Sequence, residues 1–419
     1  MSMISRTLIE QAVSATVELL RFAQPADAAL SAFFRAQRCG PRERGFIAET
    51  AYAVLRRKRS LAAKVGNDAT ARQLTLAALL SDGGLSQRTL ENALPQRDAV
   101  WIGELKAREP KLSLAEQADL PDWLYERLAV LMPKDELQQL ARALNQSAPL
   151  DLRVNLLKAN RPDVLAQLQR EALVAEACPY APEGIRMTEK IHLAKYPLFL
   201  DGSIEVQDEG SQLLGHLLAP KRGEMVVDFC AGAGGKTLLL GALMRSTGRL
   251  YAMDVSEKRL AKLKPRLARS GLSNVHPIAI AHENDQRVKR LQGKCDRVLV
   301  DAPCSGLGTL RRNPDLKWRQ TPESVAELVV KQTSILAAAA KLLKKGGRLV
   351  YATCSLLPEE NVQIVDAFLA AHPDYARRPA AAVLSAQGIQ LDMPGEDLQL
   401  QPHVHGTDGF YAAVLERVA

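Results

Sequence analysis

From Val206 onward, short apolar runs alternate with stretches of helical periodicity, and this alternation constrains the fold more than any other feature. The runs predicted as strands are Met225–Phe229, Leu250–Met253, Val275–Ile280, Asp296–Val300 and Arg348–Thr353. The helices predicted between and after them are Lys236–Met244, Glu257–Ser270, Pro322–Lys345 and Pro358–Ala370. Leu398–Leu400 and Gly409–Leu415 predict a final antiparallel hairpin. The alternation predicts an α/β domain with a mostly parallel sheet covered by helices on both faces.

The N-terminal third has a different pattern. Residues 1–145 show helical spacing of apolar side chains throughout, which predicts an all-helical domain. Residues 146–200 begin with apolar side chains that alternate with Arg153 and Asn155, which predicts a half-buried strand, and Pro162 opens a helix. We therefore expect three domains: a helical domain over 1–145, a small α/β RNA-binding module over 146–200 and the large α/β domain over 201–419. The strand face of the module either carries RNA or packs on a neighbouring element, and periodicity does not decide between the two.

Composition excludes several classes of protein. Apolar residues make up 47% and charged residues 24% of the 419 residues, as in ordinary soluble proteins, and no apolar run is long enough to span a membrane. The N-terminus enters an amphipathic helix without a signal-peptide core. The six cysteines are too sparse for a disulfide framework and form no CxxC, and the histidines form no HExxH, so we expect no metal site. These features favour the cytoplasm.

The net charge of +8 is compatible with a nucleic-acid partner, although many basic proteins have none. The basic run 56–59 either contacts phosphates or is a solvated helix end. The segment Arg311–Trp318 combines cations with an aromatic ring, which suits an RNA backbone with base stacking, but a surface loop is the alternative.

Two cysteines follow predicted strands of the large domain. Cys304 lies in the loop 301–310, DAPCSGLGTL, and Cys354 follows the strand 348–353. Ligands of open α/β sheets bind outside the carboxyl ends of the strands. We therefore expect the two strand ends to share one pocket, with both thiols facing one pyrimidine base.

A glycine-rich loop, Cys230–Gly235, joins the first predicted strand of the alternation to the next helix. It is not a P-loop, because position 230 is not glycine, and it is not a dinucleotide fingerprint, because the third glycine is replaced by Thr237. Asp254 ends the following strand, where an acid accepts hydrogen bonds from ribose hydroxyls. A nucleoside cofactor with a carboxylate and no phosphates fits this pattern, and we expect S-adenosylmethionine.

Methylation of cytosine at C5 needs the chemistry that such a pocket offers. A thiolate that adds to C6 makes C5 nucleophilic, and the adduct resolves when C5 loses its proton and the thiol is expelled. Asp301 is placed to hydrogen-bond the base and, as a neutral acid in a dry pocket, to donate to N3. Free cysteines are usually inert core residues, which is the expectation for Cys39, Cys178 and Cys295, while Cys230 packs in its loop.

Several motifs in a fixed order resemble one family. They are Asp228–Thr237 (DFCAGAGGKT), Asp301–Ser305 (DAPCS), Arg311–Trp318 (RRNPDLKW), Tyr351–Asn361 (YATCSLLPEEN), Val206–Gln212 (VQDEGSQ) and Asp408–Phe410 (DGF). Together they resemble the RNA cytosine-5 methyltransferases of the nucleolar-protein/Sun family over roughly residues 150–419. Residues 1–60 weakly resemble the RNA-binding antitermination factor NusB. The resemblance implies a class I methyltransferase fold, which is Rossmann-like, for the large domain.

The resemblance also implies roles for single residues. Cys354 would be the nucleophile and Cys304 would assist release of the product, with Asp301 as a third catalytic residue. The positions that match the family's cofactor site are Cys230, Ala231, Gly232, Ala233, Gly234, Gly235, Lys236, Asp254, Asp285 and Asp301. At Asp285 the family usually has Gly-Asp where this chain has Asn284-Asp285.

We therefore predict a monomeric enzyme that binds S-adenosyl-L-methionine and RNA and makes 5-methylcytosine in 16S ribosomal RNA. The base must be unpaired or flipped out of the stack for a thiol to reach C6. The alternatives are the same reaction on transfer RNA or large-subunit ribosomal RNA, and a non-catalytic RNA-binding assembly factor.

Overall fold

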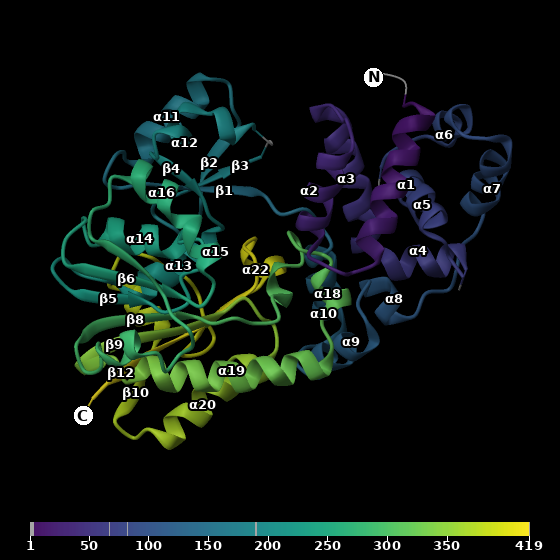
Figure 1. The fold of residues 1–419 in the computed structure, drawn as a ribbon. Coiled ribbons are helices and arrows are strands. Elements are labelled where there is room, and N and C mark those ends of the chain that lie inside the picture. The colour runs from purple at the N-terminus through teal and green to yellow at the C-terminus, as the bar shows by residue number, and fades with distance from the viewer. Residues whose placement is uncertain (1–3, 67, 82, 189–190, 419) are drawn as a thin grey trace. The chain divides into compact units, whose positions relative to one another are not determined.

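The computed structural model describes residues 4–66, 68–81, 83–188 and 191–418 (Figure 1). The chain divides into two compact units, Met1–Ser147 with Thr309–Pro322, and Ala148–Gly308 with Glu323–Ala419. The segment Thr309–Pro322 therefore groups with the N-terminal helices, which the prediction of one continuous domain over 201–419 did not anticipate. In the described part of the chain, no helix combines the length and the apolar character needed to cross a membrane.

The first unit is helical, as predicted for residues 1–145. Its helices are α1 (Arg6–Leu20), α2 (Ala26–Ala36), α3 (Pro41–Arg56), α4 (Lys58–Val65), α5 (Ala71–Ser81), α6 (Gln87–Ala93), α7 (Gln96–Lys106), α8 (Leu114–Ala118), α9 (Asp122–Ala129), α10 (Lys134–Leu144) and α18 (Leu316–Arg319). Helix α1 begins after Ser5, whose hydroxyl accepts the Leu8 amide and so satisfies one of the free N–H groups of the first turn. The helix buries Ile9, Ala12 and Leu19 on one face, as its apolar spacing requires.

The second unit begins with a small antiparallel sheet of strand order β2-β3-β1-β4. Its elements are β1 (Leu150–Val154), α11 (Arg161–Arg170), β2 (Ala175–Ala177), β3 (Gly184–Met187), α12 (Pro197–Leu200) and β4 (Ile204–Val206). The prediction that the first strand is half-buried is wrong, because Arg153 and Asn155 are buried as well. Arg153 donates to the carbonyl of Gly235, and Asn155 donates to the carbonyls of Gly202 and Ser270. The polar face of β1 is thus covered by the rest of the unit.

The large sheet has the strand order β10-β12-β9-β8-β5-β6-β7, with β11 paired to β12. Its strands are β5 (Met225–Asp228), β6 (Arg249–Asp254), β7 (Val275–Ala279), β8 (Cys295–Asp301), β9 (Leu343–Thr353), β10 (Tyr375–Arg378), β11 (Leu398–Leu400) and β12 (Phe410–Arg417). The strands from β9 to β7 in this order pair in parallel, and β10, β11 and β12 join antiparallel. The predicted fold class is confirmed.

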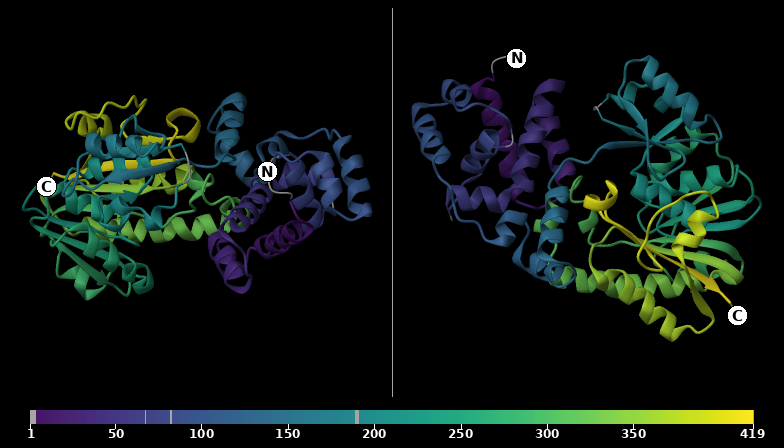
Figure 2. Two further views of the ribbon diagram at one scale, coloured as in Figure 1. Left: turned by 90° about the horizontal axis from the view of Figure 1, so that it is seen from above. Right: turned by 180° about the vertical axis from the view of Figure 1, so that it is seen from behind.

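Helices cover both faces of this sheet, and alternate residues of β9 show why. Leu349 and Tyr351 pack with α19 and α20, while Val350 and Ala352 pack with α13 and α21. In Figures 1 and 2, α19 runs along the sheet in each view. The helices of this unit are α13 (Glu209–Leu218), α14 (Gly235–Leu243), α15 (Glu257–Ala261), α16 (Leu263–Ser270), α17 (Gln286–Lys289), α19 (Pro322–Ala340), α20 (Val362–Ala371), α21 (Ala380–Ser385) and α22 (Pro402–His405).

Three element predictions are corrected. The helix predicted over 257–270 is two helices. Pro265 has no N–H to donate to the carbonyl of Ala261, and its ring would clash with that carbonyl in a continuous helix, so the break falls between Ala261 and Leu263. The helix predicted to reach Lys345 ends at Ala340, and β9 already begins at Leu343, where it pairs with Cys295 of β8. The helix predicted from Pro358 begins as a 3₁₀ turn, Pro358–Glu360, and α20 follows from Val362.

Candidate active site

The parallel strands bring five loops to one edge of the large sheet. Cys230 follows β5, Asp254 ends β6, Asp285 follows β7, Asp301 ends β8 and Cys354 follows β9. Since all five strands run in the same direction, their carboxyl ends meet at this edge, where open α/β sheets bind ligands. The predicted site residues that lie far apart in the sequence therefore share one edge of the fold.

The two thiols of this edge are in contact. The sulfur atoms of Cys304 and Cys354 are 3.4 Å apart, and the backbone amide of Cys354 donates to the sulfur of Cys304. Both residues are partly exposed. The prediction that the two strand ends bring their thiols together is confirmed.

The environment of Cys304 holds its proton in place. The hydrogen bond with Cys354 raises the pKa of the Cys304 thiol well above its usual range, and burial raises this pKa further. Cys304 is therefore a neutral thiol at neutral pH, in hydrogen-bond contact with the sulfur of Cys354. The arrangement favours Cys354 as the sulfur that reacts.

Asp301 is held as an ion pair. The Lys236 ammonium lies 2.7 Å from Oδ2 of Asp301 and 5.8 Å from the ring centre of Phe410. Burial opposes the charge of Lys236, but Asp301 outweighs it and raises the pKa of the ammonium. The role of Asp301 as a neutral donor to N3 stays a prediction. The ammonium of Lys236, which contacts this side chain, is a second N–H donor at this point of the site.

The glycine-rich loop is shaped around Asp254. Gly232 donates its backbone N–H to Oδ2 of Asp254, and Ser256 donates to Oδ1. Gly232 and Gly234 have φ of +57° and +83°, a region that favours glycine, and Gly234 precedes the first turn of α14. A Cβ at Gly235 would meet no atom within 4 Å, so the backbone is open where α14 begins. An acid beside an open helix start suits a nucleoside with a charged tail.

Asp228 lies under this loop and is not a residue that the sequence pattern singled out for chemistry. Thr237 donates to its Oδ2 at 2.6 Å, while Oδ1 has no hydrogen-bond partner among the described residues. Burial raises the pKa of this carboxyl to about 7. Asp228 therefore holds the start of α14 through its hydrogen bond with Thr237. The free energy that its burial costs depends on pH, because the charged form is the one that burial destabilises.

Asp285 has a local structural role that the sequence did not indicate. It precedes α17, its Oδ1 accepts the Arg287 amide, and its Oδ2 accepts the Ala281 amide. These backbone hydrogen bonds hold the pKa of the Asp285 carboxyl below its usual range. The residue shapes the loop that follows β7.

Gly308 and Gly409 support Cys354 and were missed as site residues. The Gly308 amide donates to the carbonyl of Cys354, and the Gly409 amide donates to the carbonyl of Gly308, each at 2.8 Å. A Cβ at Gly308 would lie 2.2 Å from the carbonyl oxygen of Gly409. Only glycine permits this approach, which is why two glycines distant in sequence belong to one site. Glycines in the motifs were the only available signal.

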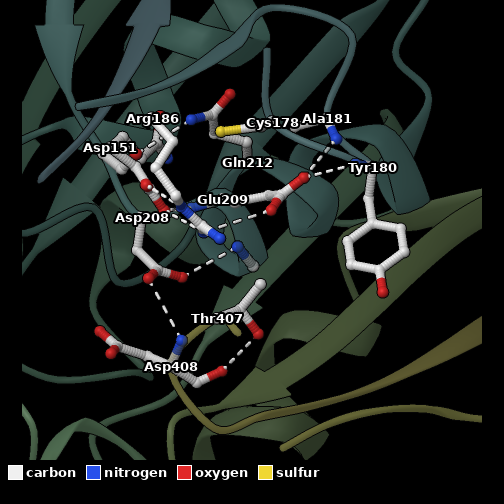
Figure 3. Close-up of polar contacts among 12 residues, drawn as sticks. Asp151, Cys178, Tyr180, Ala181, Arg186, Asp208, Glu209, Gln212, Thr407 and Asp408 are labelled. Atoms are coloured by element: carbon white, nitrogen blue, oxygen red, sulfur yellow. Dashed lines mark hydrogen bonds and ion pairs between the residues drawn. The ribbon is translucent and has the colours of Figure 1, made fainter. Parts of the chain in front are cut away.

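The motif over 206–212 forms a buried polar network instead of a catalytic group (Figure 3). Arg186 of β3 forms a bidentate ion pair with Asp151 of β1 and lies 3.4 Å from Glu209 at the start of α13. Glu209 also accepts the amide of Ala181, and Asp208 accepts the amide of Asp408. The network joins the small sheet to α13 and holds the loop that leads into Phe410.

Part of the segment Arg311–Trp318 is buried, so it is not a solvated surface loop throughout, and its contact with RNA stays a prediction. Lys317 is buried and its ammonium donates to the carbonyl of Arg56 and to the side chain of Asn145. The indole of Trp318 donates to the carbonyl of Leu55, and Asp315 accepts the amide of Ala26. These residues anchor the segment within the helical unit, so the Lys317 ammonium and the Trp318 ring serve packing.

The basic run 56–59 is likewise engaged inside this unit. Arg56 donates to the carbonyl of Arg311, Arg59 pairs with Asp122, and Lys58 lies over the Trp318 ring. A second basic surface lies elsewhere in the unit, in a depression of about 930 Å³. It is lined by residues that include Phe34, Arg35, Arg38 and Arg44. We call it the arginine depression.

The remaining cysteines are as expected. Cys39, Cys178 and Cys295 are buried, and burial raises the pKa of Cys295 to about 12. Desolvation also raises the pKa of the Cys230 thiol well above its usual range, so it stays protonated at neutral pH. Among the described residues, no group of three or more His, Cys, Asp or Glu side chains is arranged to hold a metal ion.

Comparison with known families matches two parts of the chain. Residues 215–416 match the family described as 16S rRNA methyltransferase RsmB/F. Residues 120–194 match a ferredoxin-like domain described as RsmF/B-like. The first match contains the carboxyl edge and both thiols, and the second contains most of the small sheet.

Individual proteins are similar to this chain over longer stretches. A probable ribosomal RNA small subunit methyltransferase B of Synechocystis sp. is 39% identical over 310 residues, which cover 74% of this chain and 69% of the relative. The ribosomal RNA small subunit methyltransferase B of Sodalis glossinidius is 35% identical over 353 residues, which cover 81% and 78%. The crystal structure of PH0851 is similar over 99% of both chains, with a TM-score of 0.79 and 26% identity.

Proposed function

Because this chain belongs to the 16S rRNA methyltransferase RsmB/F family, we propose that it methylates C5 of a cytosine in 16S ribosomal RNA. The chain is a methyltransferase, and its cofactor is S-adenosylmethionine. The observation that carries the proposed C5 chemistry is the 3.4 Å contact between the sulfur atoms of Cys304 and Cys354, both partly exposed at the carboxyl edge. Two adjacent thiols suit a reaction that first forms and then breaks a bond to carbon.

Cys354 is the nucleophile in this proposal. Its sulfur adds to C6 of the cytosine, which makes C5 electron-rich. Cys304 keeps its proton because its pKa is raised, so it does not compete as a thiolate. The family resemblance assigns the same role to the cysteine of the Thr-Cys motif.

Cys304 acts in release. The adduct resolves when the C5 proton passes to solvent and the electrons of the C5–H bond re-form the C5–C6 double bond, which expels the Cys354 sulfur as a thiolate. The neutral Cys304 thiol, 3.4 Å from that sulfur, can hydrogen-bond the departing thiolate and so makes it a better leaving group. A hydroxyl at position 304 has a shorter reach and a different acidity, so release slows when the thiol is lost.

Lys236 and Asp301 bind the polar edge of the base. Addition at C6 places negative charge on the ring at N3, and the Lys236 ammonium can stabilise or protonate this position. Asp301 holds the ammonium in place and is itself partly exposed, so it can accept a hydrogen bond from the exocyclic amine of cytosine.

The cofactor would be held by the loop from Cys230 to Lys236, with Asp254, Asp285 and Asp301. Asp254 would accept the ribose hydroxyls, and the open backbone at Gly235 would face the charged tail. When bound, the cofactor supplies the methyl group for C5. The unpartnered Oδ1 of Asp228 beneath the loop is a further polar atom that suits a bound ligand.

RNA binding is proposed for the helical unit as well as for the catalytic edge. The arginine depression combines three guanidinium groups with the Phe34 ring, over which Arg44 lies at 5.7 Å. Guanidinium groups with an aromatic ring suit phosphates and an unstacked base. The target cytosine itself must be unpaired or flipped to reach the thiols.

The proposed function is tested with labelled S-adenosylmethionine and purified RNA. The full-length protein is incubated with 16S ribosomal RNA, large-subunit ribosomal RNA and transfer RNA, and the modified nucleosides are identified by mass spectrometry. We expect 5-methylcytosine in 16S ribosomal RNA alone. The label in another RNA would reassign the substrate, and its absence from all three RNAs would favour a non-catalytic assembly factor.

A further inference from the structure

Glu360 is a fully buried side chain in the same motif as Cys354, Tyr351–Asn361. It lies in the 3₁₀ turn Pro358–Glu360. Burying a carboxylate is costly unless it is well hydrogen-bonded. The contacts of Glu360 show that its carboxylate is well hydrogen-bonded.

Four donors converge on this carboxylate. Oε1 accepts the backbone amide of Ser305 at 2.8 Å and the side-chain amide of Gln332 at 3.0 Å. Oε2 accepts the hydroxyls of Ser305 and Ser355. All four are neutral donors, so hydrogen bonds compensate the loss of hydration at Glu360.

The donors come from the two loops that carry the thiols. Ser305 directly follows Cys304, and Ser355 directly follows Cys354. Gln332 of α19 also donates to the carbonyl of Pro303, which directly precedes Cys304. One carboxylate therefore holds both loops, while the Tyr351 hydroxyl fixes the Glu360 carbonyl from β9.

We propose that Glu360 is a positioning residue that keeps the Cys304 and Cys354 sulfur atoms in register for attack and release on one base. This inference rests on the proposed C5 chemistry. The two loops are separate chain segments, and each is held to Glu360 through the residue next to its thiol. Loss of this link leaves the 3.4 Å contact between the thiols without its common support.

Two conservative variants separate positioning from charge. Glu360→Gln keeps the length of the side chain, and its amide can still accept from Ser305 and Gln332 while it donates to the serine hydroxyls. Glu360→Asp keeps the negative charge but is one methylene shorter and cannot reach both loops. A positioning role therefore predicts that Gln preserves activity better than Asp, and an electrostatic role predicts the reverse order.

The experiment measures methyl transfer to RNA, the melting temperature and amide hydrogen exchange of peptides covering residues 302–308 in the full-length protein. In Glu360→Asp we expect kcat to fall at least about tenfold, with the KM for RNA unchanged, because small displacements of reacting groups are costly. We also expect faster exchange in this peptide, because the Ser305 amide loses its acceptor. In Glu360→Gln both quantities should stay within about threefold of wild type. Glu327→Gln, on an exposed part of α19, is the matched control and should change neither.

The inference is overturned if Glu360→Asp keeps wild-type kcat and exchange, or if Gln loses more activity than Asp. If Glu360→Asp does not fold, Ser355→Ala replaces it, because it removes the hydrogen bond that ties the Cys354 loop to Glu360, and an unchanged kcat there overturns the inference equally. If the wild-type protein methylates no RNA, the proposed function fails, and the exchange comparison still decides whether Glu360 holds the loop.

Discussion

The sulfur atoms of Cys304 and Cys354 lie 3.4 Å apart although fifty residues separate them in the sequence. The parallel pairing of β8 with β9 produces this contact, because Asp301 is in register with Ala352 and each thiol follows a few residues later. The loops are then fixed by Glu360, which binds the residue after each cysteine. Sheet topology brings the thiols to one place, and buried hydrogen bonds set their separation.

The first prediction concerns the nucleophile. Cys354→Ser should lower methyl transfer at least about a thousandfold, since removal of a nucleophile eliminates the step that it performs. Labelled methyl incorporation into RNA measures this, with Cys295→Ala as a control because that thiol is buried at the start of β8. Appreciable turnover in Cys354→Ser would reassign the nucleophile.

A second prediction follows from the buried Asp228, whose pKa is raised to about 7 by burial. The folded protein keeps a proton there that the unfolded chain has already lost, so the free energy of unfolding should fall as the pH rises from about 4 to about 7. The difference from the usual value of 3.8 corresponds to about 4 kcal/mol. Asp228→Asn should abolish this part of the pH dependence of the free energy of unfolding.

Chemical denaturation at pH 5 and pH 8 measures the contribution of Asp228 to the free energy of unfolding. Relative to wild type, Asp228→Asn should gain stability at pH 8 compared with pH 5, while Asp392→Asn, at an exposed position, should not. Equal pH dependence in Asp228→Asn and wild type would show that Asp228 ionises normally.

A third prediction separates anchoring from RNA contact at Lys317. Lys317→Met removes the hydrogen bonds to Arg56 and Asn145 and should destabilise the protein by about 1–3 kcal/mol, the cost of unpaired buried acceptors. Burial lowers the pKa of Lys317 to about 7, so wild-type stability should rise from about pH 7 toward pH 10, and the variant should lack this rise. Its RNA affinity and salt dependence should equal those of the exposed control Lys331→Met. A loss of RNA affinity in Lys317→Met but not in Lys331→Met would show that Lys317 contacts RNA directly.

A fourth prediction tests the arginine depression. Arg38→Ala should weaken RNA binding and reduce the slope of log K against log salt by about one if the guanidinium neutralises one phosphate. Filter binding over a series of salt concentrations measures the slope. Arg88→Ala changes an exposed arginine on α6 of the same unit and should leave it unchanged. Equal slopes for Arg38→Ala and wild type would remove this surface from the RNA interface.

The parallel strands of the large sheet were predictable from their apolar pattern. Buried parallel strands such as Met225–Asp228 are apolar on both faces and end at glycines or acids, so their positions and the shared edge of the sheet were predictable. The pairing of the thiols followed from that edge. The short strand Tyr375–Arg378 was missed because it lies at the edge of the sheet and lacks an apolar run.

The predictions that were wrong concern residues whose environment is set by long-range contacts. Arg153, Lys317 and Trp318 are polar or aromatic residues whose partners lie far along the chain, and local periodicity carries no information about such partners. The same holds for Lys236 with Asp301 and for Gly308 with Gly409. A motif indicated that these residues matter but not whether they react, pack or orient a neighbour.

The central claim is that Cys354 forms the bond to the base and Cys304 assists its release. Cys304→Ser is incubated with S-adenosylmethionine and 16S ribosomal RNA, the mixture is run on a denaturing gel, and the slow band is digested and mapped by mass spectrometry. The account predicts a covalent complex whose nucleotide is attached to the peptide that contains Cys354. A nucleotide on any other residue, or methylation at the wild-type rate without a complex, would contradict it.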